Sequence, residues 1–215
     1  MNKELIKQFV TRTDPVILEV GAHLGEDSVN FVTMYPYLNL FLFEPDARCV
    51  KAIKSLRLPG FLFEGVLSDV DGFIDFHASE GIGAEAGHWE GSGSIMEPLL
   101  HKEVFTQVGF MDVHKVPSVR LDTFVIQHGI NEIDFIWMDV QGAEERVLTG
   151  GLDIFKNKVR GLFTEYSNVE LYKGGTSKER ILELLPSFRI VEDYPGGVCG
   201  DMLLANTNFE VKSNA

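Results

Sequence analysis

The stretch EVGAHLGEDS, residues 19–28, follows the short apolar run 16–18 and combines an acidic residue with two glycines four positions apart. Glycines in a turn between a strand and a helix let the main chain approach a nucleotide-like ligand closely. A dinucleotide-binding turn has the pattern Gly-x-Gly-x-x-Gly, with three glycines against a pyrophosphate. Here the pattern is Gly-x-x-x-Gly with His23 in the middle, which argues against a pyrophosphate ligand.

The acidic residue in this stretch indicates what the ligand carries. A carboxylate at the end of a strand, as Glu19 would provide, suits a ligand with an ammonium group. Gly21 and Gly25 leave room for a nucleoside beside the main chain. S-adenosylmethionine combines both features, so we expect it as the cofactor. The alternative is a tight turn whose glycines serve only the geometry of the chain.

The composition of the 215-residue chain is that of an ordinary globular protein, with 45% hydrophobic and 24% charged residues. This length and this apolar content predict a single domain over residues 1–215. The formal net charge of −13 repels phosphate backbones and anionic membranes, so we expect no nucleic acid and no membrane as partners. The sequence does not indicate an oligomeric state.

Cysteine usage and the start of the chain bear on its location. The two cysteines, Cys49 and Cys199, are too few for a disulfide framework or a zinc site, which favours a reducing, cytoplasmic setting. The first fourteen residues have apolar side chains at helical spacing but no long apolar core, which predicts a short packing helix rather than a signal peptide. No stretch approaches the roughly 20 apolar residues that span a bilayer.

Short apolar runs alternate with helical patterns along most of the chain, which predicts a mostly parallel sheet covered by helices on both faces. The expected inner strands cover residues 16–20, 40–43, 61–63, 133–138 and 159–164. The expected helices cover residues 27–34, 47–56, 121–128, 144–149 and 178–185. The fold class is therefore α/β.

Three segments depart from this alternation. FIDFHA, residues 73–78, alternates with period two and predicts an extra strand. Residues 188–206 read as strand, Pro-Gly-Gly turn and strand, which predicts an antiparallel C-terminal hairpin at the sheet edge. Residues 79–115 are rich in glycine and have little periodicity before Leu99, and we expect a substrate lid or insertion there.

Polar residues follow two further strands. Glu44 ends an apolar strand 23 residues after Gly21, where a carboxylate accepts hydrogen bonds from ribose hydroxyls. Pro45 pre-sets the start of the next helix and so fixes the direction of that carboxylate. Ser68 and Asp69 follow the third strand, where the pair either binds an adenine edge or forms an ordinary turn. Both interpretations of Ser68 and Asp69 stay open.

The apolar strand expected over residues 133–138 leads directly to Asp139. Open α/β sheets bind ligands at the carboxyl ends of their strands, so we expect Asp139 where a donor methyl group and an acceptor hydroxyl meet. Gly142 allows a sharp turn after it. Glu144 falls in the first turn of the next helix, where the helix dipole favours it, and we interpret it as structural.

Several of these motifs together resemble the FkbM family of S-adenosylmethionine-dependent methyltransferases. The motifs are residues 19–25, Glu44-Pro45, Ser68-Asp69, Val119-Arg120-Leu121-Asp122 and above all IDFIWMDVQGAEERVLTGG, residues 133–151. The resemblance extends from about Val16 to GDMLLAN, residues 200–206. Its most specific part is the Asp-x-x-Gly-x-Glu run that begins at Asp139.

This resemblance implies a Rossmann-like class I methyltransferase fold, with a seven-stranded sheet whose last strand is antiparallel. It also implies O-methylation of a hydroxyl on a small-molecule or glycan acceptor, such as a sugar or another natural product. The chain departs from the commoner family pattern at Trp137, where a lysine is frequent, and at Gln141, where a glutamate is frequent. Both positions flank Asp139 and bear on the acceptor more than on the cofactor.

The site residues follow from these motifs. An alcohol is a poor nucleophile until a base takes its proton, and we expect Asp139 as that base, with His88 on the lid and Glu165 as further candidates. A magnesium ion held by Asp139, Glu165 and Asn168 is an open alternative. The residues expected to bind the cofactor are Glu19, Gly21, Ala22, His23, Gly25, Glu44, Pro45, Ser68, Asp69 and Asp139.

Two other classes of protein remain as alternatives. The first is a catalytically inactive cofactor-binding protein with the same fold, which the unusual residues around Asp139 would explain. The second is a nicotinamide oxidoreductase, which the missing third glycine disfavours.

Overall fold

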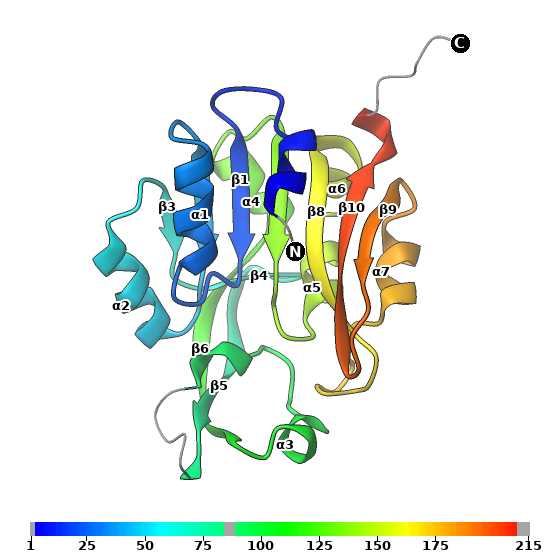
Figure 1. Cartoon of the computed structure of the whole chain (residues 1–215). Coiled ribbons are helices and arrows are strands. Elements are labelled where there is room, and N and C mark those ends of the chain that lie inside the picture. The colour runs from blue at the N-terminus through cyan, green and yellow to red at the C-terminus, as the bar shows by residue number, and fades with distance from the viewer. Residues whose placement is uncertain (1–2, 84–88, 210–215) are drawn as a thin grey trace.

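The computed structural model describes residues 3–83 and 89–209. Its centre is a seven-stranded sheet in the order β3-β2-β1-β7-β8-β10-β9 (Figure 1). All of its strands are parallel except β10, which is antiparallel to both neighbours. The strands are β1 (Val16–Val20), β2 (Asn39–Phe43), β3 (Phe61–Phe63), β7 (Ile133–Met138), β8 (Val159–Ser167), β9 (Phe188–Tyr194) and β10 (Cys199–Asn206). The expected α/β fold with an antiparallel C-terminal hairpin is confirmed.

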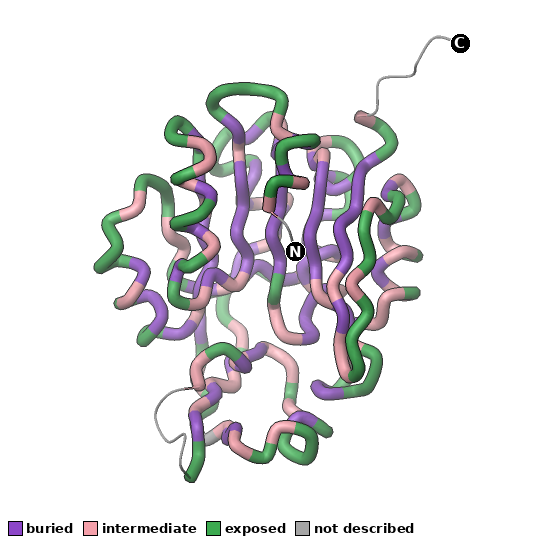
Figure 2. The backbone as a smooth tube through the Cα atoms, in the orientation of Figure 1, coloured by how far each residue is buried: buried purple, intermediate pink, exposed green. Residues whose placement is uncertain are grey.

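Helices cover both faces of this sheet, so its central strands are buried (Figure 2). Every residue of β7 is buried, which explains its nearly unbroken apolar run. One face packs against α4 (Leu121–Gln127), α5 (Glu144–Thr149), α6 (Leu152–Lys158) and α7 (Lys178–Leu184). The other face packs against the 3-10 helix η1 (Lys3–Gln8), α1 (Glu26–Met34) and α2 (Ala47–Leu56). No helix in the described ranges is long and apolar enough to cross a membrane.

A second, three-stranded sheet projects from the carboxyl edge of the main sheet (Figure 1). Its strands are β4 (Val66–Ser68), β5 (Gly72–Gly81) and β6 (Val108–Arg120). Between β5 and β6 the chain forms the 3-10 helix η3 (Glu90–Ser92) and the short helix α3 (His101–Val104). The segment 79–115 therefore begins and ends in paired strands, and η3 lies between them at the carboxyl edge.

The strand β6 and the helix α6 are elements that sequence patterns did not predict. β6 contains Pro117, which is atypical of a paired strand, and it carries one extra residue between Phe110 and Asp112, where its register with β5 shifts. The middle of β6 is exposed from Asp112 to Val113, so its side chains do not alternate cleanly between apolar and polar. β5 extends the expected strand 73–78 at both ends.

The turn after β1 lies directly against the main chain at the end of β7. Gly21 has φ +85°, and a Cβ atom there would lie 1.9 Å from the Asp139 carbonyl oxygen. His23 and Gly25 also have positive φ, 49° and 86°. The turn is thus held in a left-handed conformation against β7, and only glycine fits at position 21.

We expect Gly21→Ala to lower the melting temperature and to abolish cofactor binding. The left-handed backbone alone costs a non-glycine residue about 1–2 kcal/mol, and the added methyl group would also displace Asp139. Gly197→Ala is the matched control, since a Cβ there meets nothing within 4 Å. A Gly21→Ala protein that melts and binds cofactor like the Gly197→Ala protein would contradict this packing.

Candidate functional site

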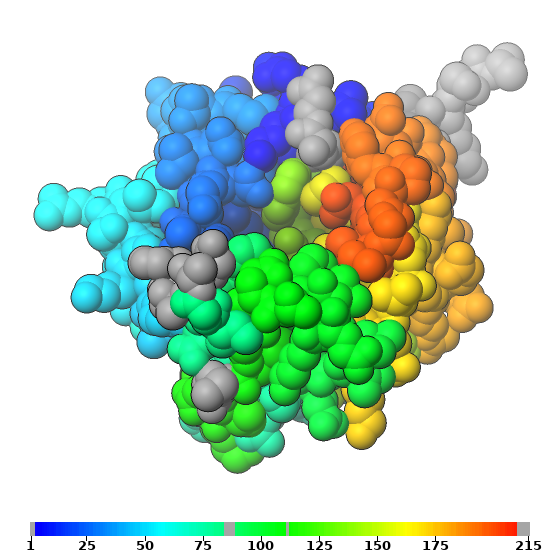
Figure 3. All heavy atoms as spheres, turned by 60° about the horizontal axis from the view of Figure 1, so that its bottom comes forward, coloured from blue at the N-terminus to red at the C-terminus, as the bar shows by residue number. Residues whose placement is uncertain are grey.

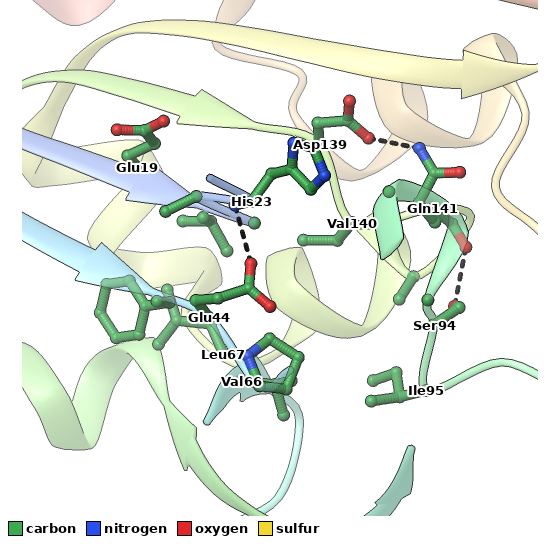
Figure 4. A pocket seen from close by; sticks show the side chains of 18 of the residues that line it. Glu19, His23, Glu44, Val66, Leu67, Ser94, Ile95, Asp139, Val140 and Gln141 are labelled. Carbon is green, nitrogen blue, oxygen red and sulfur yellow. Dashed lines mark hydrogen bonds between the residues drawn. The ribbon is translucent and has the colours of Figure 1, made fainter. Parts of the chain in front are cut away.

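A cavity of about 410 Å³ opens at the carboxyl ends of β1, β2 and β7 (Figure 4). Its walls come from the turn after β1, the end of β2, the start of β4, the segment around η3 and the turn between β7 and α5. The cavity brings together seven of the residues that the sequence predicted for cofactor binding. They are Glu19, Gly21, Ala22, His23, Glu44, Pro45 and Asp139.

The charge of this cavity is one-sided. Among the described residues that line it, six are acidic and none is lysine or arginine. The acidic residues are Glu19, Glu26, Asp27, Glu44, Glu90 and Asp139. Carboxylates gathered in a recess attract cations and repel anions. The cavity therefore suits a ligand with positive charge, and it disfavours the pyrophosphate of a dinucleotide.

Glu44 ties two parts of the cavity wall together. Its carboxylate is 5% exposed and accepts the backbone N–H groups of His23 and Asp46, each at 2.8 Å. Burial raises the pKa of Glu44 to about 8, against the opposing effect of these two hydrogen bonds. Glu44 thus fixes the left-handed turn at His23 and presents a carboxyl group to the cavity.

Glu19 is a second buried carboxyl group at this site. It is 2% exposed, and its Oε2 accepts the hydroxyl of Ser28 in α1 at 2.5 Å. Burial raises the pKa of Glu19 to about 8. No lysine or arginine among the described residues forms an ion pair with it within 4.0 Å. A cationic ligand in the cavity would supply the missing positive charge.

The opposite end of the cavity is apolar. Val66 and Leu67 of β4, Ile95 after η3 and Val140 after β7 line it, and Figure 4 shows them on the side away from Glu19. Such a surface suits the flat face of a nucleobase. The sequence offered Ser68 and Asp69, which directly follow these β4 residues, either for an adenine edge or for an ordinary turn.

Ser68 and Asp69 do not line this cavity. The chain leaves the main sheet along β4, and the side chains after Leu67 lie elsewhere. Ser68 donates its hydroxyl to Asp69 at 2.9 Å, and Asp69 forms an ion pair with Arg146 at 2.8 Å. The structure thus gives this pair a role in holding α5.

Gly25 also lies outside the set that lines the cavity. Gly25 precedes α1 and packs against α2, where a Cβ would lie 2.8 Å from Leu56 Cδ1. Its role in the described structure is the turn itself. His88 lies outside the described residues.

Gln141 links the two carboxylates at the ends of β7 and β8. Its Nε2 donates to Asp139 Oδ1 at 2.7 Å and lies 3.5 Å from Glu165 Oε2. The hydroxyl of Tyr172, which donates to the Ser92 carbonyl oxygen at 2.7 Å, lies 3.2 Å from Gln141 Oε1. Gln141 has φ 52°, a conformation that favours glycine or asparagine. Its place two residues after Asp139 was the only sign of this role in the sequence.

The two carboxyl groups beside Gln141 bind protons more tightly than isolated ones. Burial, with the neighbouring Asp139 charge, raises the pKa of Glu165 to about 9. The pKa of Asp139 is also raised, because the cleft desolvates its carboxyl group even though the side chain opens on the cavity. At neutral pH Glu165 therefore holds a proton, and the Asp139 carboxyl group beside it binds its own proton more tightly than an isolated aspartate does.

The described residues give no support to a magnesium site. Within residues 3–83 and 89–209, no group of three or more His, Cys, Asp or Glu side chains is placed to hold a metal ion. The amide of Asn168 donates to the carbonyl oxygen of Gly196 at 2.9 Å, so it holds the turn between β9 and β10.

The fold is shared with solved methyltransferase structures. A chain of the fibrillarin/Nop5p complex matches 91% of this chain over 74% of its own length, with a TM-score of 0.51 and 12% identity. Magnesium protoporphyrin IX methyltransferase from Synechocystis PCC 6803, solved with bound S-adenosylmethionine, matches 95% of this chain over 77% of its own, with a TM-score of 0.50 and 8% identity. The chain therefore has the fold of class I methyltransferases.

Sequence comparison gives the family. The model of the methyltransferase FkbM domain matches residues 19–193. The 2-O-methyltransferase NoeI of Sinorhizobium fredii (strain NBRC 101917 / NGR234) is 43% identical over 207 residues, which is 95% of this chain and 84% of that protein. The chain belongs to the FkbM methyltransferase family, as its motifs indicated.

We expect Glu44→Ala to weaken S-adenosylhomocysteine binding by about 1–3 kcal/mol, the cost of losing a charged hydrogen-bond partner. Calorimetry at 25 °C measures this affinity, and thermal melting shows that the variant is folded. Glu64→Ala is the control, because that exposed glutamate pairs with Lys54 outside the cavity. An affinity unchanged by Glu44→Ala would contradict a role for Glu44 in ribose binding.

The raised pKa of Glu19 predicts a pH-dependent stability. The folded protein retains the Glu19 proton up to about pH 8, whereas the unfolded chain loses it near 4.5. The free energy of unfolding of the cofactor-free protein should therefore fall as pH rises from about 5 to 8. The Glu19→Gln side chain cannot ionise, so the free energy of unfolding of this variant should fall less over the same pH range.

Urea unfolding at pH 6 and pH 8.5 measures this difference. The exposed Glu103→Gln is the matched control and should follow the original protein. An equally steep fall in the Glu19→Gln variant would show that Glu19 ionises normally in the folded protein.

Proposed function

We propose that this chain transfers a methyl group from S-adenosylmethionine to a hydroxyl group of a sugar or other small molecule. The observation that carries the proposal is the cavity with six acidic residues and, among its described lining residues, no lysine or arginine. S-adenosylmethionine bears a sulfonium and an ammonium group, so its charge is complementary to this cavity. The name of the 43% identical relative, a 2-O-methyltransferase, supports an oxygen acceptor.

The residues present fit this cofactor at three points. Glu44 would accept hydrogen bonds from the ribose hydroxyls, since each of its oxygens has a lone pair left after the backbone contact. Glu19 would pair with the ammonium group. Val66 and Leu67 would pack against the adenine. When bound, S-adenosylmethionine supplies an electrophilic methyl group.

Asp139 would act as the general base for the acceptor hydroxyl. It lines the cavity at the end of β7, and the hydrogen bond from Gln141 fixes its Oδ1 and leaves its Oδ2 for a proton. A raised pKa makes a carboxylate a better base near neutral pH. Glu165 would serve as a protonated partner, a donor to substrate oxygen, because its pKa is about 9.

The unusual Gln141 is compatible with catalysis. Its amide lies between Asp139 and Glu165 and adds no negative charge of its own. This argues against the inactive cofactor-binding alternative, since the acid pair is intact. Incubation with labelled S-adenosylmethionine and a panel of glycosides and small alcohols distinguishes an active methyltransferase from an inactive cofactor-binding protein. The inactive protein would bind the cofactor without transferring its methyl group to any acceptor.

We also infer a cytoplasmic location, for which the two unpaired cysteines, Cys49 and Cys199, are the support. A magnesium requirement stays a separate hypothesis. A chelator added to the transfer assay tests it: activity unchanged by the chelator would contradict any magnesium-assisted step.

We expect Asp139→Asn to lower kcat by about 10²–10⁴-fold, the range that general acid–base catalysis contributes. The amide can still accept the Gln141 hydrogen bond, so the affinity for S-adenosylhomocysteine should change only several-fold. Single-turnover rates and calorimetry measure the two quantities. Equal losses of turnover and of cofactor affinity would identify Asp139 as a cofactor-binding or folding residue.

A further inference from the structure

A second cavity, of about 440 Å³, adjoins the first. His23, Glu90, Gly91 and Gln141 line both cavities. Gly91 lies against the His23 ring, since a Cβ on Gly91 would be 3.5 Å from His23 Nε2. His23, Gly91 and Gln141 thus form part of the boundary between the two cavities. A group in the second cavity would lie next to Asp139.

Three parts of the chain that are distant in sequence form the walls of the second cavity. Leu24 comes from the turn after β1, Trp89 and His101 from the segment between β5 and β6, and Cys199 from the start of β10. Figure 3 shows a hollow between these blue, green and orange-red parts of the surface. The cavity is therefore open to solvent on the side opposite the nucleobase end of the first.

We propose that this second cavity is the acceptor site and that it binds a neutral sugar ring, as a glycoside without phosphate. The proposal rests on the methyl transfer to a hydroxyl proposed above and adds the class of acceptor and the place where it binds. Three features of this cavity support it: the apolar wall, the uncharged polar groups and the charge.

The apolar wall is an aromatic platform held in place. Trp89, Phe105 and Leu171 contribute it. The Trp89 indole N–H donates to the Ser92 hydroxyl at 3.1 Å, so the ring is oriented and its only polar atom is engaged. Ser92 is itself anchored, because its carbonyl oxygen accepts the Tyr172 hydroxyl at 2.7 Å. A fixed indole face packs well against the C–H face of a pyranose.

Uncharged polar groups stand beside this platform. His101 is 2% exposed, and its Nδ1 has no hydrogen-bond partner among the described residues. Burial lowers the pKa of His101 to about 4, so the imidazole is neutral at physiological pH. The protonated Glu165 and the amide of Gln141 lie on the side toward the first cavity. These groups can donate to and accept from several hydroxyls at once.

The charge of the second cavity excludes an anionic acceptor. No lysine or arginine is among the described residues that line it, whereas Glu90 and Glu165 are. A sugar phosphate or a nucleotide sugar would bring one or more negative charges toward Glu90 and toward the acidic first cavity, whereas the protonated Glu165 adds no charge.

Binding without turnover tests this proposal. With S-adenosylhomocysteine saturating the first cavity, the protein is titrated with methyl glycosides of several hexoses and with neutral oligosaccharides. The same sugars as 1-phosphates and nucleoside diphosphates form the second arm. The chain has two tryptophans, and Trp137 lines the first cavity, which S-adenosylhomocysteine already fills. A fluorescence change on titration that is lost in the Trp89→Phe variant therefore reports Trp89.

We expect at least one neutral glycoside to bind at least tenfold more tightly than its phosphorylated forms. Trp89→Ala should raise the acceptor KM at least tenfold with kcat and S-adenosylhomocysteine affinity unchanged, and Trp89→Phe should retain most of the binding. Phe73→Ala, on the exposed side of β5, is the control. Thermal melting identifies misfolded variants, and Phe105→Ala is then the substitute.

Three outcomes would overturn the proposal. They are tighter binding of the phosphorylated sugars, an acceptor KM insensitive to both Trp89→Ala and Phe105→Ala, and no binding of any neutral glycoside. These outcomes are distinct from a failure of the proposed function. That function predicts cofactor binding and methyl transfer to a hydroxyl whichever cavity holds the acceptor, so only the absence of binding or of transfer would contradict it.

Discussion

The close approach of Gly21 to the main chain of Asp139 is the contact on which the site depends. It brings the turn after β1 against the end of β7, and the buried Glu44 holds the same turn through the His23 N–H group. The ends of β1, β2 and β7 thereby form one wall. Because this wall is made largely of main chain and buried carboxyl groups, its shape is set by the fold, and its charge is set by a few acidic side chains.

That charge distinguishes this site from other nucleotide sites on similar sheets. Dinucleotide sites place a helix N-terminus and glycine amides against phosphate. Here Glu19, Glu44 and Asp139 surround the same region, and burial raises the pKa of all three. The cavity without ligand therefore holds poorly solvated acids, and a cation is the ligand that relieves this cost. The acceptor cavity continues the same acidic character and adds a fixed aromatic face.

The sequence predicted the main sheet well and the second sheet poorly. Buried strands such as β7 and capped helices such as α2 follow from local patterns, and α2 begins and ends at the predicted residues. β6 depends on pairing with β5 far along the chain, which local patterns do not encode. The same reason decides which site residues could be predicted. Glu19 and Glu44 were found because they lie at the ends of predicted strands. Val66 and Trp89 were not, because they reach the cavities only through the second sheet. Gln141 was noted as unusual, but its link between two carboxylates needs the register of β7 and β8.

A structure of the protein with S-adenosylhomocysteine tests the central claim most directly. The account predicts this compound in the first cavity, with its ribose at Glu44, its ammonium group at Glu19 and its sulfur on the side of Asp139 and the second cavity. An empty first cavity at saturating S-adenosylhomocysteine, or the compound bound with its adenine among the acidic residues and its amino-acid end at Val66 and Leu67, would contradict it.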